Sequence, residues 1–272
     1  MEAPGDDDAA EGRRLAADAV TCRGISRAYL PRVKRSSPFV ALSNVDLSVA
    51  DGEFLTILGP SGCGKSTLLN VMAGIDQPTR GSVTFSGRIK KKAYLFQRDT
   101  LLPWRTALRN VEIGLESENI PRSERRERAQ EWLRLVGLEG FEQSYPSQLS
   151  GGMRRRVALA TVFAHGPEIL FMDEPFGAVD AQTRLQLQGE LLSLWQRQQC
   201  TVIFVTHDIE EALLLGDRVV VMASRPGRII DSLPVDVPRP RTVESIRFDP
   251  IMAKMAQRIW HELSATTSDV AG

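Results

Sequence analysis

The chain has 272 residues, in which 34 lysines and arginines balance 34 aspartates and glutamates, and it has three cysteines. This length can bury one large core or two small ones, and the charge balance gives no basic face for nucleic acid. The scattered Cys22, Cys63 and Cys200 have no metal-binding spacing and favour a reducing compartment. No apolar run approaches the roughly 20 residues that span a bilayer, so a membrane role is expected to come through a partner.

The chain begins with an acidic segment that has no apolar stretch and is not expected to be a signal peptide. We predict a disordered tail over residues 1–18. Strands are expected from Val20 to Tyr29 and from Val40 to Val49, with a basic loop over 31–38 between them. Residues 50–53 form a predicted turn.

Residues 59–67 have the spacing G-x-x-x-x-G-K-[ST], which is typical of a loop that binds phosphate. A β-prone run from Phe54 to Leu58 precedes it, and a helical pattern ending at Gly74 follows, which is the context the motif needs. Its glycines let backbone N–H groups point at phosphate oxygens. Lys65 can reach the terminal phosphates, and the Ser66 hydroxyl can ligate Mg²⁺. The predicted nucleotide-binding residues here are Gly59, Pro60, Ser61, Gly62, Cys63, Gly64, Lys65, Ser66 and Thr67.

Cys63 lies inside this loop, where a small side chain suffices; a redox role is the alternative.

The middle of the chain is predicted to be mainly helical. Before it, Gly81 to Ile89 is expected to form a strand pair and Ala93 to Phe96 a short strand. Residues 106–165 have a helical pattern, and Ser123 is expected to cap a helix with a charged, solvated face.

The segment Leu149-Ser150-Gly151-Gly152-Met153 precedes a strong helix from Arg154 to Ala164. A serine and two glycines at a helix N-terminus indicate a second anion-binding site, and the alternative is a simple helix cap. Two phosphate sites with one P-loop favour a closed two-fold dimer, in which each copy offers its Ser-Gly-Gly turn to the ATP of the other.

Two strand ends in the second half carry candidate catalytic groups. Ile169 to Met172 is an unbroken apolar run, typical of a buried parallel strand, and Asp173 and Glu174 follow it. Asp173 suits the Mg²⁺ shell, mostly through water, and Glu174 suits the activation of an attacking water. His207 follows the predicted strand Thr201 to Val205 and can contact a γ-phosphate.

The last third is predicted to alternate helices and strands. Helices are expected over 181–199 and from Ile209 to Leu215, and a strand from Arg218 to Ala223. Pro234, Pro238 and Pro240 mark a loop. A terminal helix from Pro250 to Leu263 has Ile251, Met255, Ile259 and Leu263 on one face.

From about residue 20 to 240 the chain resembles the nucleotide-binding subunit of an ATP-binding-cassette (ABC) transporter. Residues 59–67 match its Walker A loop, 149–153 its signature and Ile169 to Asp173 its Walker B strand. The resemblance implies that Gln97 is the Q-loop glutamine that senses Mg²⁺ and the membrane partner. It implies that Glu174 is the catalytic glutamate, Asp180 the D-loop residue and His207 the switch histidine. Tyr29 resembles the aromatic residue that stacks on adenine, with Phe39 as its rival.

The family's fold is α/β: a P-loop NTPase core, a small antiparallel β part and an α-helical signature subdomain. We therefore expect an ABC ATPase domain over 19–240, its helical subdomain over about 100–162, and a C-terminal helical extension over 241–272. Met153, Val179 and Thr161-Val162 depart from the usual residues at their positions. We expect the first two changes to be tolerated and the third to alter a helix-surface contact.

Three segments, Leu101 to Trp104, residues 173–178 and residues 235–241, resemble the nitrate, sulfonate and taurine importer branch. The stretch from Gly87 to Gln97 and the Pro-Arg-Pro-Arg tail are most like aliphatic-sulfonate importers. The apolar segment Leu101 to Trp104 suits a groove for a short helix of a membrane subunit, or else ordinary core packing.

The resemblance implies an ATPase that uses ATP and Mg²⁺ and that energises solute import. Its partners would be a second copy, two integral membrane permease subunits and a separate substrate-binding protein. It would lie at the cytoplasmic face of the cell membrane as a peripheral subunit, without nucleic acid. The rival classes are a soluble cassette ATPase that acts on nucleic acid or ribosomes, and an inactive scaffold. The single cassette and the neutral charge disfavour the first rival; Glu174 and His207 disfavour the second.

Overall fold

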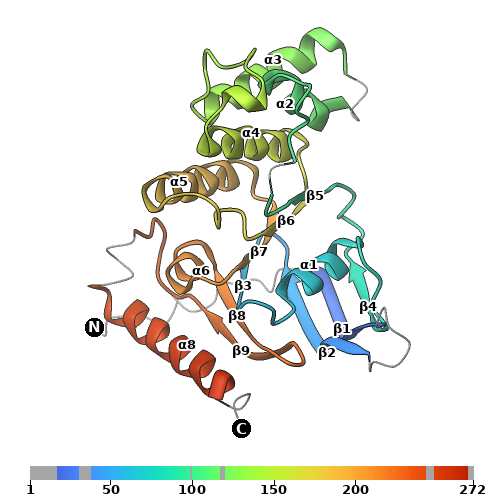
Figure 1. The fold of residues 1–272 in the computed structure, drawn as a ribbon, viewed down its shortest axis with the longest axis vertical. Helices are drawn as coiled ribbons and strands as arrows, with labels where there is room; N and C mark the ends of the chain where they lie inside the picture. The colour runs from blue at the N-terminus through green and yellow to red at the C-terminus, as the bar shows by residue number, and fades with distance from the viewer. Residues whose placement is uncertain (1–16, 31–37, 99, 117–119, 243–247, 269–272) are drawn as a thin grey trace, which may run out of the picture.

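The computed structural model describes residues 17–30, 38–98, 100–116, 120–242 and 248–268. Most of the predicted N-terminal tail and of the basic loop after Tyr29 lies outside these residues. Within them, two sheets and the helices around them form a core with a helical layer at one end (Figure 1). None of the described helices has both the length and the apolar character needed to cross a membrane.

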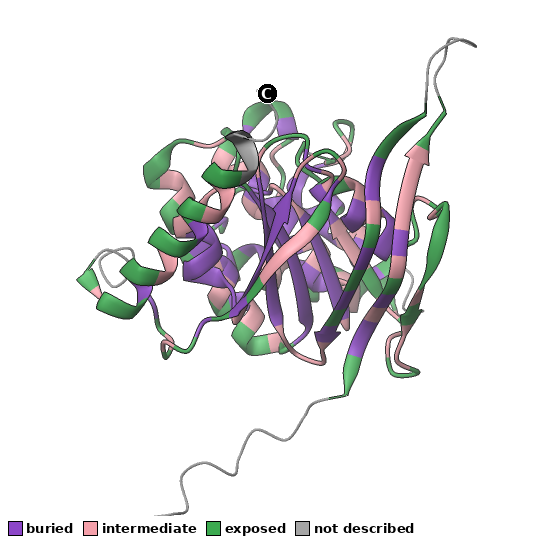
Figure 2. Cartoon of the chain, turned by 90° about the horizontal axis from the view of Figure 1, so that it is seen from below, coloured by how far each residue is buried: buried purple, intermediate pink, exposed green. Residues whose placement is uncertain are grey.

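The larger sheet has six strands in the order β5-β6-β7-β3-β8-β9. The first five run parallel, and β9 is antiparallel to β8. The strands are β5 (Lys92–Leu95), β6 (Ile169–Asp173), β7 (Thr201–Thr206), β3 (Phe54–Leu58), β8 (Arg218–Ala223) and β9 (Arg228–Pro234). The central strands are almost entirely buried because helices or the second sheet cover both faces (Figure 2).

The smaller sheet is antiparallel, in the order β2-β1-β4. It comprises β1 (Asp18–Tyr29), β2 (Phe39–Ala50) and β4 (Arg80–Phe85). This is the small antiparallel part that the family resemblance implies.

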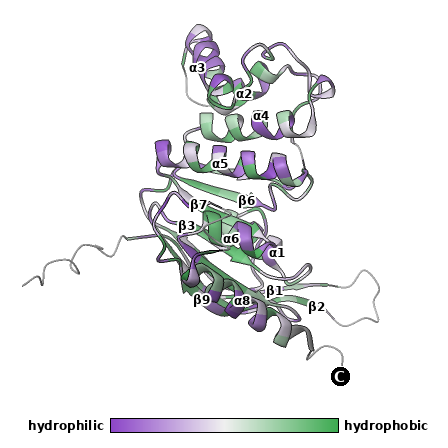
Figure 3. Cartoon of the chain, turned by 90° about the vertical axis from the view of Figure 1, so that its left-hand side faces the viewer, coloured by the Kyte–Doolittle hydropathy of each residue, from purple (hydrophilic) through white to green (hydrophobic). Residues whose placement is uncertain are grey.

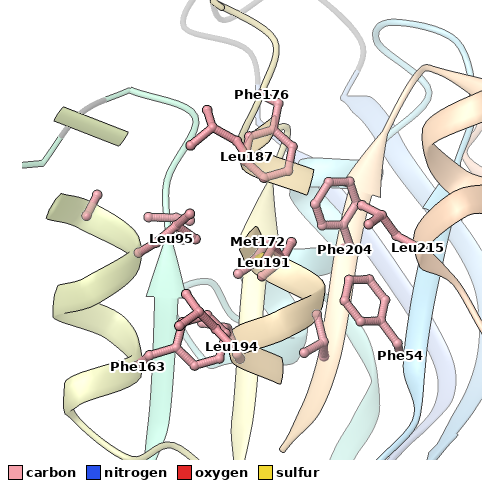
Figure 4. Packing of buried hydrophobic residues seen from close by; sticks show 14 of the residues in the cluster. Phe54, Leu95, Phe163, Met172, Phe176, Leu187, Leu191, Leu194, Phe204 and Leu215 are labelled. Atoms are coloured by element: carbon pink, nitrogen blue, oxygen red, sulfur yellow. The ribbon is translucent and has the colours of Figure 1, made fainter. Parts of the chain in front are cut away.

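Alternate residues of the parallel strands enter two separate cores. Leu55 and Ile57 of β3 and Val205 of β7 pack with the smaller sheet and with α1 (Lys65–Ala73). Phe54 and Phe204 face the other way, toward the remaining helices, because successive side chains of a strand point to opposite faces. Figure 4 shows this second core, in which side chains of α4 (Gly151–Ala164) and α5 (Ala181–Gln198) gather over the sheet.

Three helices form the predicted helical subdomain: α2 (Ala107–Glu116), α3 (Arg122–Leu135) and α4, which pack against one another. The charged α3 is largely hydrophilic along its length (Figure 3), in line with the solvated face that the sequence predicts. A short 3₁₀ helix, Pro146–Gln148, precedes α4. The other helices that lie within the described residues are α6 (Ile209–Leu215) and α8 (Pro250–Ser268).

Two local predictions were wrong, and one strand was not predicted. The segment from Gly81 to Ile89 contains one strand and not a pair: β4 ends at Phe85, and a turn follows in which the Ile89 amide donates to the Ser86 carbonyl. Ser123 does not cap α3; Pro121, with its ring-restricted φ, takes that position and the helix starts at Arg122. Residues 106–165 are mainly helical, as predicted, in separate helices joined by loops and a 3₁₀ turn. Strand β9 was missed because only its pairing with β8 distinguishes it from the predicted proline-marked loop.

The C-terminal helix begins at Pro250 as predicted, with the Asp249 carboxylate accepting the amides of Ile251 and Met252 at 2.8 and 3.2 Å. Three residues of the predicted stripe face the core: Ile259 is fully buried, and Met255 and Leu263 pack against the core. Ile251 is exposed instead, and Met252 takes the buried position at this end of the helix. The domain boundaries themselves stay predictions.

Candidate nucleotide-binding site

The P-loop connects β3 to α1, which starts at Lys65. Gly62 and Gly64 have φ of 79° and 98°, in the region that favours glycine. A Cβ on Gly64 would lie 2.8 Å from Leu42 Cδ2 and 2.9 Å from the Ala41 carbonyl. Glycine is therefore required here both by the turn and by the close approach of β2.

The Lys65 ammonium group is folded into this loop. It donates hydrogen bonds to the carbonyls of Gly59 at 2.8 Å and Pro60 at 3.1 Å, and it lies 3.6 Å from Glu174 Oε1. Only 4% of the side chain is exposed. The positive charge is thus held between the loop and the end of β6. Thr67 lies in the first turn of α1, and Ser61 is exposed on the loop.

Cys63 packs inside the loop and is buried. Burial raises the pKa of its thiol, although the charge of Lys65 opposes this effect. A raised pKa disfavours the reactive thiolate, so the packing role fits the residue better than the redox alternative.

Ser66 and Asp173 bring two oxygen groups together from different elements. The Ser66 hydroxyl donates to Asp173 Oδ1 at 2.8 Å. Burial raises the pKa of Asp173, and the nearby charge of Glu174 adds to this, while the Ser66 hydrogen bond and the charge of Lys65 oppose it. Clustered hydroxyl and carboxylate oxygens are ligands that Mg²⁺ prefers.

Glu174 is the centre on which the predicted catalytic residues converge. Its Oε2 lies 3.3 Å from His207 Nδ1 and 3.5 Å from Gln97 Nε2, and Lys65 approaches its other oxygen. Its backbone has φ of 40°, a costly conformation for a residue with a side chain, and its amide donates to the Val205 carbonyl at 3.0 Å. Strained backbone of this kind is concentrated at functional sites.

The predicted signature turn starts α4. The Ser150 hydroxyl accepts the Met153 amide at 3.2 Å, so Ser150 is a helix cap, which was the alternative interpretation of this motif. A Cβ on Gly152 would lie 2.8 Å from Thr183 Cγ2, which brings the turn close to α5. Ser150, Gly151, Gly152 and Asp180 line one open hollow of about 380 Å³. The turn therefore faces solvent next to the D-loop candidate.

Asp180 caps α5 by accepting the Thr183 amide at 3.0 Å. This backbone hydrogen bond is the largest cause that lowers the pKa of Asp180, so the residue is a carboxylate at neutral pH.

The two candidate aromatic residues lie side by side. Tyr29 and Phe39 are direct partners in the β1–β2 register. The Tyr29 hydroxyl donates to Asp76 at 2.8 Å, and the Arg27 guanidinium lies 4.5 Å from the ring centroid. Phe39 is 60% exposed against 38% for Tyr29. The assignment of the adenine-stacking role to Tyr29 stays a prediction.

Two residues that support the site had no signal in the sequence. Gly227, between β8 and β9, approaches the P-loop so closely that a Cβ there would lie 2.3 Å from the Cys63 carbonyl. Arg155 of α4 is buried and donates to the Phe96 carbonyl at 2.9 Å, directly before Gln97. Both contacts join segments far apart in the chain, and no local pattern predicts them.

A larger hollow, about 840 Å³, lies elsewhere among the described residues, beside Gly52, Glu168 and Cys200 at the amino ends of the strands. It contains none of the predicted site residues.

Comparison with known proteins shows the family to which this chain belongs. Residues 42–177 match the ABC transporter family. An uncharacterized ABC transporter ATP-binding protein of Methanocaldococcus jannaschii is 54% identical, over 76% of this chain and 80% of its own length. The aliphatic sulfonates import ATP-binding protein SsuB of Bacillus cereus is 40% identical, over 83% of this chain and 90% of its own length.

Among solved structures, the ATP-binding cassette MJ0796, in a dimeric post-hydrolysis state bound to ADP and Pi, superposes with a TM-score of 0.69. It is 33% identical, and the match covers 80% of this chain and 100% of that one. The chain therefore belongs to the ABC transporter family and contains its ATP-binding domain.

Proposed function

We propose that this chain is the ATP-hydrolysing subunit of a membrane importer, and that two copies bind two ATP molecules between them. The observation that carries the proposal is the convergence of Lys65, Gln97 and His207 on the Glu174 carboxylate. These residues come from four separate parts of the chain, and this arrangement suits hydrolysis better than binding alone.

The residues present fit ATP and Mg²⁺. The P-loop amides, the N-terminus of α1 and Lys65 would hold the phosphates. Ser66 and Asp173, whose oxygens lie 2.8 Å apart, would hold Mg²⁺ together with Gln97. When bound, Mg²⁺ neutralises charge on the phosphate oxygens.

Glu174 would act as the base in the reaction. Its carboxylate orients a water and takes its proton as the water oxygen bonds to the γ-phosphorus and the bond to ADP breaks. His207, 3.3 Å from the same carboxylate, would orient this group and contact the γ-phosphate. The products are ADP and inorganic phosphate.

The Ser150–Gly152 turn would complete the site of a second copy. It faces an open hollow with Asp180, and the helix N-terminus behind it favours an anion. Support comes from MJ0796, a relative whose cassette is dimeric. ATP binding would then close the dimer, and hydrolysis would open it.

The importer role and its substrate rest on the relatives and on one surface. SsuB relatives support a small anion or organic solute, such as an aliphatic sulfonate, taurine or nitrate. Trp104 is 71% exposed, and the Leu102 amide beside it is held by Asn110 Oδ1 at 2.8 Å. This segment would receive a permease helix, so the chain would work at the cytoplasmic face of the membrane with two permease subunits and a substrate-binding protein.

The ATPase proposal is tested with Glu174→Gln, which keeps the shape of the side chain and removes the base. We expect phosphate release to fall by roughly 10²- to 10⁴-fold while ATP still binds. Glu124→Gln on the surface of α3 is the control and should keep the full rate. Release by Glu174→Gln near the unmutated rate would reject the role.

The substrate class is tested separately, with the chain assembled with its permease subunits and binding protein. Liposomes containing the complex should take up labelled ethanesulfonate, taurine or nitrate only with ATP. Uptake of none of these by a complex that hydrolyses ATP would reject the substrate class and leave the ATPase assignment intact.

A further inference from the structure

A buried polar network lies directly behind His207. At its centre is Glu211 of α6, a carboxylate that is only 7% exposed. Its Oε1 accepts a hydrogen bond from Gln188 Nε2 of α5 at 2.9 Å, and its Oε2 accepts one from the Thr206 hydroxyl at the end of β7. The carboxylate thus joins three elements of the fold.

The same network encloses the switch residue on both sides. The Thr206 hydroxyl accepts the Asp208 amide at 3.0 Å, across His207. Asp208 in turn accepts the Glu211 amide at 3.1 Å and lies 3.5 Å from Arg184 Nη1 of α5. Thr206 and Asp208, the two chain neighbours of His207, are therefore both held by Glu211.

This network also adjoins the catalytic carboxylate. Glu174, His207, Thr206 and Glu211 line one small hollow, together with Arg184. The helix that supplies Gln188 and Arg184 begins at Asp180, the D-loop candidate on the face beside Ser150. A displacement of α5 would thus change the position of His207 through the side chains of this network.

A buried carboxylate is expensive, because the charge loses its hydration and must be fully hydrogen-bonded to persist. Burial raises the pKa of Glu211, and the bonds from Thr206 and Gln188 oppose this effect. Apolar residues would fill the same space at lower cost. The buried acid is therefore better explained by the geometry it imposes on the segment 206–208 than by stability.

We propose that Glu211 and Thr206 are positioning residues that hold His207 against the carboxylate of Glu174 and couple it to α5. This inference rests on the proposed ATPase function. Neither residue is assigned contact with ATP; both act through His207.

The test compares two threonines on the same strand. Thr206→Val removes the hydroxyl that binds Glu211. Thr201→Val makes the same change at the other end of β7, where the buried hydroxyl accepts the Gly52 amide at 3.0 Å. We expect Thr206→Val to lower kcat by about 10- to 100-fold with little change in the KM for ATP, and Thr201→Val to keep kcat.

Two further variants separate positioning from folding. Thr206→Ser restores a hydroxyl and should recover most of kcat, whereas Glu211→Gln should reproduce the loss, since the network requires an acceptor at Oε2. If Thr206→Val acts through His207, it should add little to the loss in a His207→Ala background.

The outcomes distinguish a failure of the proposed ATPase function from a failure of the positioning role of Glu211 and Thr206. A wild-type protein without ATPase activity would reject the proposed function itself. With an active wild type, the inference is overturned if Thr206→Val and Thr201→Val have equal kcat. It is also overturned if Thr206→Val and His207→Ala lower kcat independently, or if His207→Ala has no effect.

Discussion

The two predicted phosphate-binding regions differ in how far a single chain assembles them. Around the P-loop, polar side chains gather from the carboxyl ends of β3, β5, β6 and β7 and from the residues that follow these strands. The polar atoms of each interacting pair lie no more than 3.6 Å apart. The signature turn instead begins a helix of another subdomain, and among the described residues its Ser150 hydroxyl bonds to its own helix. The carboxyl edge of a parallel sheet gathers ligands by itself, whereas a lone helix start needs a second surface to complete a site.

The largest effect is expected at the P-loop region, which a single chain assembles. Lys65→Ala removes the charge held by the Gly59 and Pro60 carbonyls. We expect ATP affinity to fall by about 10- to 100-fold, because a hydrogen bond to a charged group contributes about 1.5–3 kcal/mol. Calorimetric titration measures this, with Lys254→Ala on α8 as the control; unchanged affinity would contradict the P-loop assignment.

A substitution in the signature turn, which a single chain leaves incomplete as a site, should affect only the dimer. Ser150→Asp keeps a good helix cap and places a carboxylate where the ATP of a second copy would lie. We expect ATP binding to a single copy to persist and hydrolysis to fall roughly 100-fold, since juxtaposed like charges cost several kcal/mol.

Ser150→Asn is the neutral cap that controls for stability. Sedimentation in a Glu174→Gln background should give an ATP-dependent dimer for Ser150→Asn and monomer for Ser150→Asp. Equal dimerisation of the Ser150→Asn and Ser150→Asp variants would show that Ser150 serves only as a helix cap.

A smaller effect is expected at Gly227, where the turn between β8 and β9 lies in close contact with the P-loop. The new methyl group of Gly227→Ala would meet the Cys63 carbonyl at 2.3 Å. We expect the free energy of unfolding to fall by about 1–3 kcal/mol, with weaker ATP binding.

Gly189→Ala is the matched control for this change, because an added methyl group there meets nothing within 4 Å and lies in a helix. It should raise the free energy of unfolding by about 0.5–1 kcal/mol in urea titrations. A Gly227→Ala protein as stable as this control would show that the close approach is not needed.

The smallest effect concerns the pH dependence of stability. The folded pKa of Asp173 is raised above its ordinary value of 3.8, so the folded chain binds this proton more tightly than the unfolded chain. Stability from this group therefore falls as pH rises from about 3.8 to the raised folded value. Asp173→Asn should raise the melting temperature at pH 7, by about 2–4 °C per kcal/mol relieved, and should abolish Mg²⁺-dependent hydrolysis.

Thermal scans without nucleotide measure this shift, and the gain should vanish about one pH unit below 3.8, where Asp173 is protonated in both states. A melting temperature that falls at pH 7 would contradict the burial cost.

Local structure could be predicted from the sequence where residues that are neighbours in the chain determine it. The strand, glycine loop and helix around Lys65 are contiguous, and the helix stops at Gly74, whose φ is 80°. Prediction failed where distant segments decide. The buried guanidinium of Arg241 donates to carbonyls of Leu213, Val235 and Val237, so part of the Pro-Arg-Pro-Arg tail that resembled an importer motif anchors the C-terminal extension to α6.

The amino-acid order alone determined the family, the phosphate loop and the identity of the candidate base, because glycine spacing and uninterrupted apolar runs are local properties. Only the folded chain decided which groups touch. The approach of His207 and Gln97 to Glu174, the contact of the 227 turn with the loop and the burial of Glu211 each depend on strand order and helix packing. Those pairings join residues from 23 to 164 positions apart, a range at which periodicity carries no information.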